Sequence, residues 1–138
     1  MSTRAIIALP SPKGFITSWC WYDGGPSILG RELREYFKDE SDVRQLLRLH
    51  SFSSILGPRA FKKFIMSDGD TAVVLSNLRV VLMHPDDGKV VAGKGKHGYF
   101  KTLGEMLGQD LNYVYVFKDG KWKTYGYKSL RMILSVGE

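Results

Sequence analysis

The segment at residues 88–94, GKVVAGK, is the first stretch whose residue types and spacing match a known chemistry. It matches the opening of a phosphate-binding loop, in which glycine N–H groups and a lysine hold phosphate oxygens. The next position of that motif must be Ser or Thr to bind magnesium, but here it is Gly95. The preceding sequence, HPDD, is typical of a turn and not of a buried strand. We therefore interpret the segment as a turn, a short strand and a loop.

Metal-ligating and nucleophilic side chains are present, but they do not form a complete set. His84, Asp86 and Asp87, with His97 further along, are possible metal ligands whose spacing matches no closed site. Cys20 would need an activating base, and it lies among aromatic residues, where a buried and inert thiol is the usual state. No pair of carboxylates has a diagnostic spacing. We therefore expect no enzymatic activity, no metal and no cofactor.

The stretch at residues 15–31, FITSWCWYDGGPSILGR, is the strongest candidate for a binding site. Its β-branched and aromatic residues predict a strand, the glycines break it, and Pro26 suits the first position of a helix. Such a junction directs free backbone N–H groups toward a ligand. The residues expected to line this anion-friendly corner are Arg4, Asp23, Gly24, Gly25 and Ser27. In the alternative interpretation, Asp23 and Ser27 only stabilise the turn and the helix start.

A basic loop at residues 89–101 is the second candidate surface. It contains no acidic residue, and glycines interrupt it. Basic and aromatic residues together hold nucleic acids by phosphate contact and by stacking. The residues expected to contact a nucleic acid or another anion are Lys89, Lys94, Lys96, His97, Tyr99 and Lys101. The lysines of the last hairpin would extend this surface, and a solvated loop is the alternative.

The composition predicts one domain with one core in a chain of 138 residues. The net charge of +6 is compatible with a polyanionic partner such as a nucleic acid or a nucleotide. No apolar run approaches the roughly 20 residues of a membrane span, so we expect no membrane partner. The single Cys20 fits a reducing compartment, and the first residues do not resemble a signal peptide, so we expect a cytoplasmic protein.

The elements of the first half are predicted from their apolar spacing. Residues 4–9 and 15–22 are expected to form a hairpin. A helix from Pro26 should bury Leu29, Leu33, Tyr36 and Phe37, and a second helix should begin with Ser41 as its N-cap and bury Val43, Leu46 and Leu47. Residues 51–57 are expected to be a connector. A third helical segment from Pro58 should direct Ala60, Phe61, Phe64 and Ile65 inward.

The second half is predicted to consist mostly of strands. Residues 71–75, 78–83 and 89–92 have the composition of strands, and Thr102 and Glu105 have the spacing of a helix capping box. Residues 112–127 should form a hairpin around Asp119-Gly120, with Phe117 opposite Trp122. The aromatic side of this hairpin should be buried and the side with Val114, Val116 and the lysines should face water. Together these elements predict an α+β domain with a mixed or antiparallel sheet and helices mainly on one face.

Several of these motifs resemble a family of small uncharacterised proteins of phages and prophages. They are STRAIIAL at the start, WCWYDGGPSILG, the connector SFSSILG and the hairpin YVYVFKDGKWKTY. The positions that match the family pattern are Arg4, Cys20, Asp23, Gly24, Pro26, Ser27, Gly30, Phe117, Gly120 and Trp122. Trp21 and Tyr22 replace the family's His-Trp, and Gly25 replaces its Tyr, so proton transfer by that histidine is not available here.

The resemblance implies a phage context and no particular reaction. By analogy with small phage proteins outside the structural modules, we expect a non-enzymatic accessory protein that binds a host factor in host takeover or counter-defence. Its target is expected to be a host protein or a small anionic nucleotide. The alternative hypothesis is a nucleic-acid-binding domain that uses the basic loop and the lysine face of the last hairpin.

Overall fold

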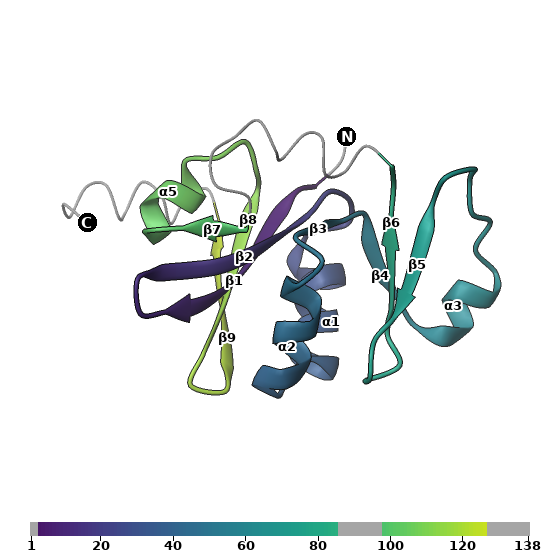
Figure 1. Ribbon diagram of the computed structural model, residues 1–138, viewed down its shortest axis with the longest axis horizontal. Helices are drawn as coiled ribbons and strands as arrows, with labels where there is room; N and C mark the ends of the chain where they lie inside the picture. Colours follow the sequence, from purple (N-terminus) through teal and green to yellow (C-terminus); the bar gives the residue numbers. More distant parts are fainter. Residues whose placement is uncertain (1–2, 86–97, 127–138) are drawn as a thin grey trace.

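The computed structural model of the protein describes residues 3–85 and 98–126. Its strands form two sheets (Figure 1). In sheet A the order is β3-β2-β1-β8-β9, and β7 also pairs with β2. The strands of sheet A are β1 (Ala5–Ser11), β2 (Gly14–Cys20), β3 (Ser51–Phe52), β7 (Tyr99–Phe100), β8 (Tyr113–Lys118) and β9 (Lys121–Gly126). Sheet B has the order β4-β6-β5, with β4 (Ser54–Leu56), β5 (Thr71–Val74) and β6 (Val80–Met83).

Sheet A is mixed and sheet B is antiparallel. β1 runs parallel to β8, and β2 runs parallel to β3, while the remaining pairs of sheet A are antiparallel. The helical elements are η1 (Pro26–Gly30, a π-helical turn), α1 (Arg31–Tyr36), α2 (Glu40–Leu47), α3 (Pro58–Lys62) and α5 (Leu103–Leu107). The predicted α+β class with a mixed sheet is confirmed. Among the described residues, no helix is long and apolar enough to span a membrane.

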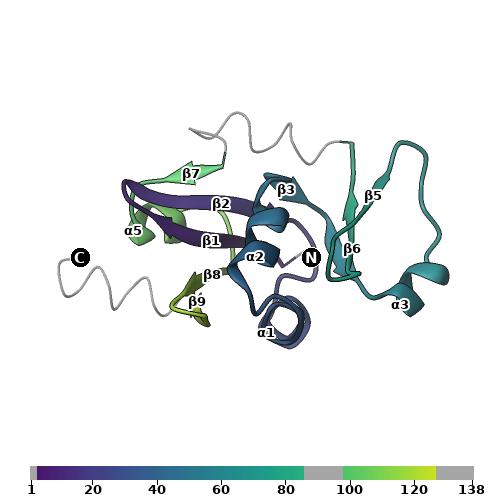
Figure 2. The same cartoon turned by 60° about the horizontal axis from the view of Figure 1, so that its bottom comes forward.

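The helices α1 and α2 lie between the two sheets in both views (Figures 1 and 2). One core cluster joins them to both sheets: Leu33 and Leu46 of the helices pack with Ile7 of sheet A and Val81 of sheet B. These side chains are buried because their spacing of three and four residues gives each helix one apolar face. Tyr36 is an exception to the predicted apolar face, because its side chain remains 42% exposed.

A second core cluster covers the opposite face of sheet A. There α5 contributes Met106 and Leu107, which pack with Trp19, Val114 and Val116. The prediction that Val114 and Val116 face water is therefore wrong, since both faces of β8 are covered. The Thr102 half of the predicted capping box is confirmed, because the Thr102 hydroxyl accepts a hydrogen bond from the Glu105 N–H at 3.1 Å.

The last hairpin has the predicted register. Phe117 lies opposite Trp122, and the two rings meet edge to face with centroids 5.0 Å apart. Asp119 and Gly120 both have positive φ, as the predicted type I′ turn requires. The Trp122 indole N–H also donates to the Phe37 carbonyl at 2.9 Å, which joins β9 to the end of α1.

Four predictions for the middle of the chain are wrong or fall outside the described residues. Residues 51–57 are not a connector, because they form β3 and β4 and pair with two different sheets. Ser41 lies inside α2, which begins at Glu40. The helix α3 ends at Lys62, so Phe64 and Ile65 lie beyond it, and both are exposed. Within α3, Ala60 is exposed as well and Phe61 is partly buried. The strand expected at residues 89–92 lies outside the described residues.

Candidate interaction surface beside the Glu32–Arg79 ion pair

The glycine junction between β2 and η1 is held by backbone contacts. The Gly24 N–H donates to the Thr3 carbonyl at 3.0 Å, and the Tyr115 hydroxyl donates to the Gly24 carbonyl at 2.7 Å. A Cβ on Gly24 would lie 2.9 Å from the Thr3 carbonyl oxygen, so the close approach requires glycine. The junction is thereby tied to the start of β1 and to β8.

One of the two N–H groups expected in the anion-binding corner at the start of η1 is already used. The Gly25 carbonyl accepts the N–H groups of Ile28 and Gly30, so the Ile28 N–H is already used. No side chain caps this helix start, which also makes the predicted capping by Asp23 wrong. Asp23 instead has a positive φ of 56°, a conformation that Asp adopts more readily than most residues.

Arg4 is directed away from Ser27. Its guanidinium forms an ion pair with Asp110 at 2.7 Å and lies over the Trp21 ring at 5.7 Å. Its backbone N–H donates to the Asn112 side chain, so Arg4 joins β1 to the segment before β8. Of the predicted ligand-binding residues, the structure keeps Asp23, Gly24 and Gly25 together in one turn and does not bring Arg4 to Ser27.

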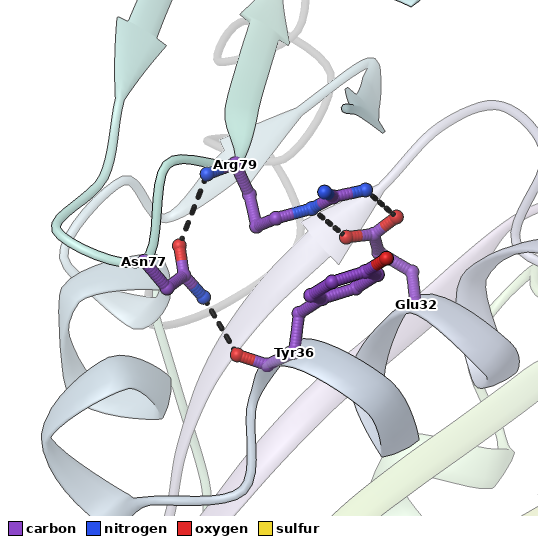
Figure 3. Close-up of polar contacts among 4 residues, drawn as sticks. All are labelled: Glu32, Tyr36, Asn77 and Arg79. Atoms are coloured by element: carbon purple, nitrogen blue, oxygen red, sulfur yellow. Dashed lines mark hydrogen bonds and ion pairs between the residues drawn. The ribbon is translucent and has the colours of Figure 1, made fainter. Parts of the chain in front are cut away.

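A largely buried ion pair joins α1 to the residue that precedes β6 (Figure 3). Ser27 and both members of the pair line the same depression. The Arg79 guanidinium binds both carboxylate oxygens of Glu32, with Nη2 2.8 Å from Oε1, and only 12% and 13% of the two side chains are exposed. The guanidinium also stacks on the Tyr36 ring, 3.6 Å from its centroid. The planar guanidinium of an arginine can bind both oxygens of a carboxylate and stack on a ring at the same time. A lysine could not replace Arg79 here, because its ammonium group has no such planar shape.

The turn between β5 and β6 completes the cluster. The Asn77 side chain accepts the Arg79 N–H at 3.2 Å and donates to the Tyr36 carbonyl at 2.7 Å (Figure 3). The Leu75 N–H donates to the Arg79 carbonyl, which defines a three-residue turn. In such a turn the third residue adopts a left-handed conformation, a position that favours glycine. Here that residue is Leu78, with φ of 66° and a side chain that is 65% exposed.

A depression of about 300 Å³ lies over the ion pair. Its lining residues are Ser27, Ile28, Arg31, Glu32, Glu35, Tyr36 and Arg79. The charges are balanced, because Arg31 pairs with Glu35 at 3.0 Å and Arg79 pairs with Glu32. Two of its lining side chains, Ile28 and Tyr36, are large, apolar or aromatic, and exposed. We define the α1–β6 surface as Ile28, Tyr36 and Leu78 together with the Glu32–Arg79 pair.

A cationic depression of about 260 Å³ lies at the end of α2. It is lined by Ile16, Arg44, Leu47, Arg48 and His50, so its ionisable groups are basic and its other contacts are apolar. Arg44 also pairs with Glu40 at 2.9 Å. The α-carbon of Gly98 lies against the His50 ring, since a Cβ there would be 2.7 Å from Nδ1.

Only part of the predicted basic loop falls within the described residues. Lys89, Lys94, Lys96 and His97 lie outside them. Tyr99 belongs to β7, pairs with Ile16, and donates its hydroxyl to the Lys13 carbonyl in the β1–β2 turn. Lys101 is exposed just before α5.

The residues that could have carried covalent or metal chemistry have other surroundings. Cys20 is 1% exposed, and its Sγ lies 3.1 Å from the Tyr22 carbonyl oxygen, a contact of the kind a buried structural thiol makes. Among residues 3–85 and 98–126, no group of three or more His, Cys, Asp or Glu side chains could hold a metal ion. Asp86, Asp87 and His97 lie outside those ranges.

The residues of the ion pair were not identified from the sequence. Glu32 lies on an amphipathic helix where a solvated charge is ordinary, and Arg79 is 47 positions away. The one available signal was Arg79 itself, a charged residue between two runs of branched apolar residues. Arg44 and Arg48 were missed for a similar reason, because their cationic depression forms only when α2 packs over β2.

No protein-family model matches the chain, and neither a curated protein nor a solved structure matches it.

Proposed function

We propose that this protein is a phage-type accessory protein that acts without catalysis by binding a host protein in the host cytoplasm. The host process would be takeover of the cell or counter-defence. The α1–β6 surface is the proposed contact region. The proposal includes membership of the phage and prophage family, and this part of it rests on the motifs that the chain shares with that family.

The observation that carries the proposal is the backbone conformation of the exposed Leu78. Four non-glycine residues in the described part of the chain have positive φ: Asp23, His50, Leu78 and Asp119. Asp and His tolerate this conformation, whereas a branched apolar residue in it is strained. Burial does not offset the strain of Leu78, because 65% of its side chain is exposed. Strained residues of this kind concentrate at functional sites, so we assign Leu78 a role in binding.

The exposed side chains that line the depression over the ion pair favour a protein partner over an anionic nucleotide. Ile28 is 55% exposed and Tyr36 is 42% exposed, which gives the surface apolar and aromatic anchors. The charges in the depression cancel in two pairs, so no free cation is available there for a phosphate. Apolar anchors surrounded by paired charges are typical of protein interfaces.

The test compares variants of exposed residues in a cross-linked pull-down from a lysate of the bacterium that carries the gene. Leu78→Gly should relieve backbone strain, keep or raise the thermal stability, and lose the retained host protein. Ile28→Asp should lose the same protein. Thr124→Asp, at an exposed position of β9 outside the α1–β6 surface, is the matched control and should retain it. Equal retention by all three variants would refute the proposal.

Nucleic-acid binding is the second candidate function, because the cationic depression carries Arg44 and Arg48 beside an apolar floor. Fluorescence anisotropy with a labelled single strand and a duplex tests it. Binding should weaken steeply as salt is raised, and Arg44→Gln with Arg48→Gln should lower the salt slope by about two. A salt slope that these substitutions leave unchanged would contradict nucleic-acid binding at the cationic depression.

A further inference from the structure

The cationic depression lies where the end of α2 meets β2. Its described lining contains three basic side chains, two apolar side chains and no carboxylate: Arg44, Arg48, His50, Ile16 and Leu47. Its volume of about 260 Å³ is slightly below the roughly 300–1,000 Å³ of pockets that enclose a whole drug-sized ligand. The depression therefore has room for one charged group and for part of whatever is attached to that group.

Arg44 and Arg48 keep hydrogen-bond donors for a ligand. Arg44 uses its Nε to pair with Glu40 at 2.9 Å. Within the described ranges, neither the Nη atoms of Arg44 nor the side chain of Arg48 makes a hydrogen bond or an ion pair. Two arginines four positions apart on one helix repel each other. An anion between them would remove this repulsion and would accept hydrogen bonds from both guanidinium groups.

The two acidic residues of α2 do not cancel these cations. Glu40 faces Arg44 only, so one of the two arginines remains without a counterion. Asp42 precedes Arg44 by two positions and therefore lies about 200° away around the helix. It is directed toward the β5–β6 turn, where the Ser76 hydroxyl lies 3.5 Å from its carboxylate. Among the described residues, the charge at the cationic depression is therefore positive.

The backbone at the end of α2 also holds His50 in place. Unpaired carbonyls at a helix end would repel an anion, but the Leu46 and Leu47 carbonyls accept the N–H groups of Leu49 and His50 at 3.2 Å. The His50 carbonyl in turn accepts the Trp19 N–H of β2 at 2.9 Å. His50 has a φ of 59°, a conformation that glycine most often adopts after a helix. The sequence thus places an imidazole at the depression where glycine is usual.

We propose that the cationic depression binds the terminal phosphate monoester of a nucleotide or of a nucleic-acid end. The phosphate oxygens would accept hydrogen bonds from Arg44 and Arg48, and the attached sugar or base would lie on Ile16 and Leu47. A monoester suits the site better than the diester backbone, because it carries close to two negative charges and its chain ends there. The inference rests on the second candidate function only in using the same depression, and it is independent of the α1–β6 surface.

The probes are adenosine 5′-monophosphate, adenosine and inorganic phosphate, each titrated into the full chain. Backbone amide shifts in NMR spectra give the dissociation constant and locate the site. We expect adenosine 5′-monophosphate to shift the amides of Arg48, Leu49 and His50. It should bind more tightly than inorganic phosphate, because only the nucleotide can also contact Ile16 and Leu47, and adenosine should not bind.

The decisive variant is Arg48→Gln, because this arginine is exposed and its side chain has no partner within the described residues. The variant should unfold at about the same temperature and bind adenosine 5′-monophosphate about tenfold more weakly, as expected when a hydrogen bond to a charged group is lost. Arg48→Lys keeps the charge but not the planar fork, so it should recover part of the affinity. Arg59→Gln, which removes the same charge from an exposed position of α3, is the matched control and should bind the nucleotide normally.

Two labelled single strands that differ only at the 5′ end distinguish the two sources of the phosphate. One carries a 5′ phosphate and the other a 5′ hydroxyl, and fluorescence anisotropy compares their affinities. If the ligand is a nucleic-acid end, the phosphorylated strand should bind about tenfold more tightly. If the ligand is a free nucleotide, neither strand should bind while adenosine 5′-monophosphate does.

Several results would overturn the inference. They are absence of binding by adenosine 5′-monophosphate, equal binding by Arg48→Gln, and equal affinity for adenosine. Equally tight binding of the two strands would also overturn it, because the contact would then be with the diester backbone. Equal affinity for inorganic phosphate would contradict the role of Ile16 and Leu47. None of these probes depends on Leu78, so failure of the host-protein assay and failure of this inference are distinguishable.

Discussion

Replacement of Arg79 by methionine tests whether the buried ion pair holds sheet B to α1. Glu32 is 13% exposed, so Arg79→Met leaves a carboxylate in a poorly hydrated place without its cation. Breaking one partner of a buried pair costs about 3–5 kcal/mol. The stacking on Tyr36 is lost as well, while the methionine side chain keeps part of the apolar contact. We expect a loss of about 4 kcal/mol, a large part of the 5–15 kcal/mol that stabilises a typical domain.

The measurement is urea unfolding followed by tryptophan fluorescence and circular dichroism. With a slope of about 2 kcal/mol per molar urea, the midpoint should fall by about 2 M. Arg31→Met is the matched control, because it breaks the exposed pair with Glu35, whose side chains are 70% and 46% exposed, and should change the midpoint little. The reasoning is refuted if Arg79→Met and Arg31→Met have the same midpoint.

The double variant Glu32→Gln with Arg79→Met separates the contribution of the two charges to stability from the contribution of packing. Removing both charges leaves no buried ion without a partner, so the double variant should be more stable than Arg79→Met alone. If it is equally unstable, the loss comes from packing and from the stacking on Tyr36 and not from the charge on Glu32.

Substitutions at four further positions test the junction and the last hairpin. Gly24→Ala should lower stability by about 1–3 kcal/mol, because its Cβ would meet the Thr3 carbonyl, whereas Gly25→Ala has nothing within 4 Å and should be neutral in thermal unfolding. Burial, with a smaller contribution from a neighbouring tyrosine, raises the pKa of the Tyr115 hydroxyl above its usual value. The unfolded chain therefore loses this proton first, and stability should fall above about pH 10, less so in Tyr115→Phe when urea unfolding is compared at about pH 9 and pH 11. Trp122→Ala should lower stability by about 3 kcal/mol in the same assay, because it removes a partly buried ring, and a Trp122→Phe variant should recover most of the loss.

Local sequence signals predicted those elements whose partners are close in the chain. The hairpin around Asp119-Gly120 was predicted with its register, since the turn residues fix which side chains lie opposite one another. The hairpin of β1 and β2 and the Thr102 cap follow from equally local signals. In these places turn chemistry and apolar alternation agree with the tertiary structure.

The errors occur where the structure depends on distant segments. Residues 51–57 become strands only because β2 and β6 offer open edges to them. Val114 and Val116 were expected to face water, but α5 covers that face of β8. The Glu32–Arg79 pair was missed because each residue is unremarkable in its own element, and only the packing of sheet B against α1 removes both charges from water.

Sheet B carries part of the α1–β6 surface, and its attachment to the rest of the molecule decides how that surface is presented. Arg79 precedes β6 directly, so the ion pair with Glu32 positions the turn that presents Leu78. The same strand β6 pairs with β5, which forms the other arm of that turn. A partner that contacts Leu78 would therefore bind a turn whose geometry is set by a single, largely buried charge pair. Preorganisation of this kind reduces the ordering cost of association, because the turn is already held in place when the partner arrives.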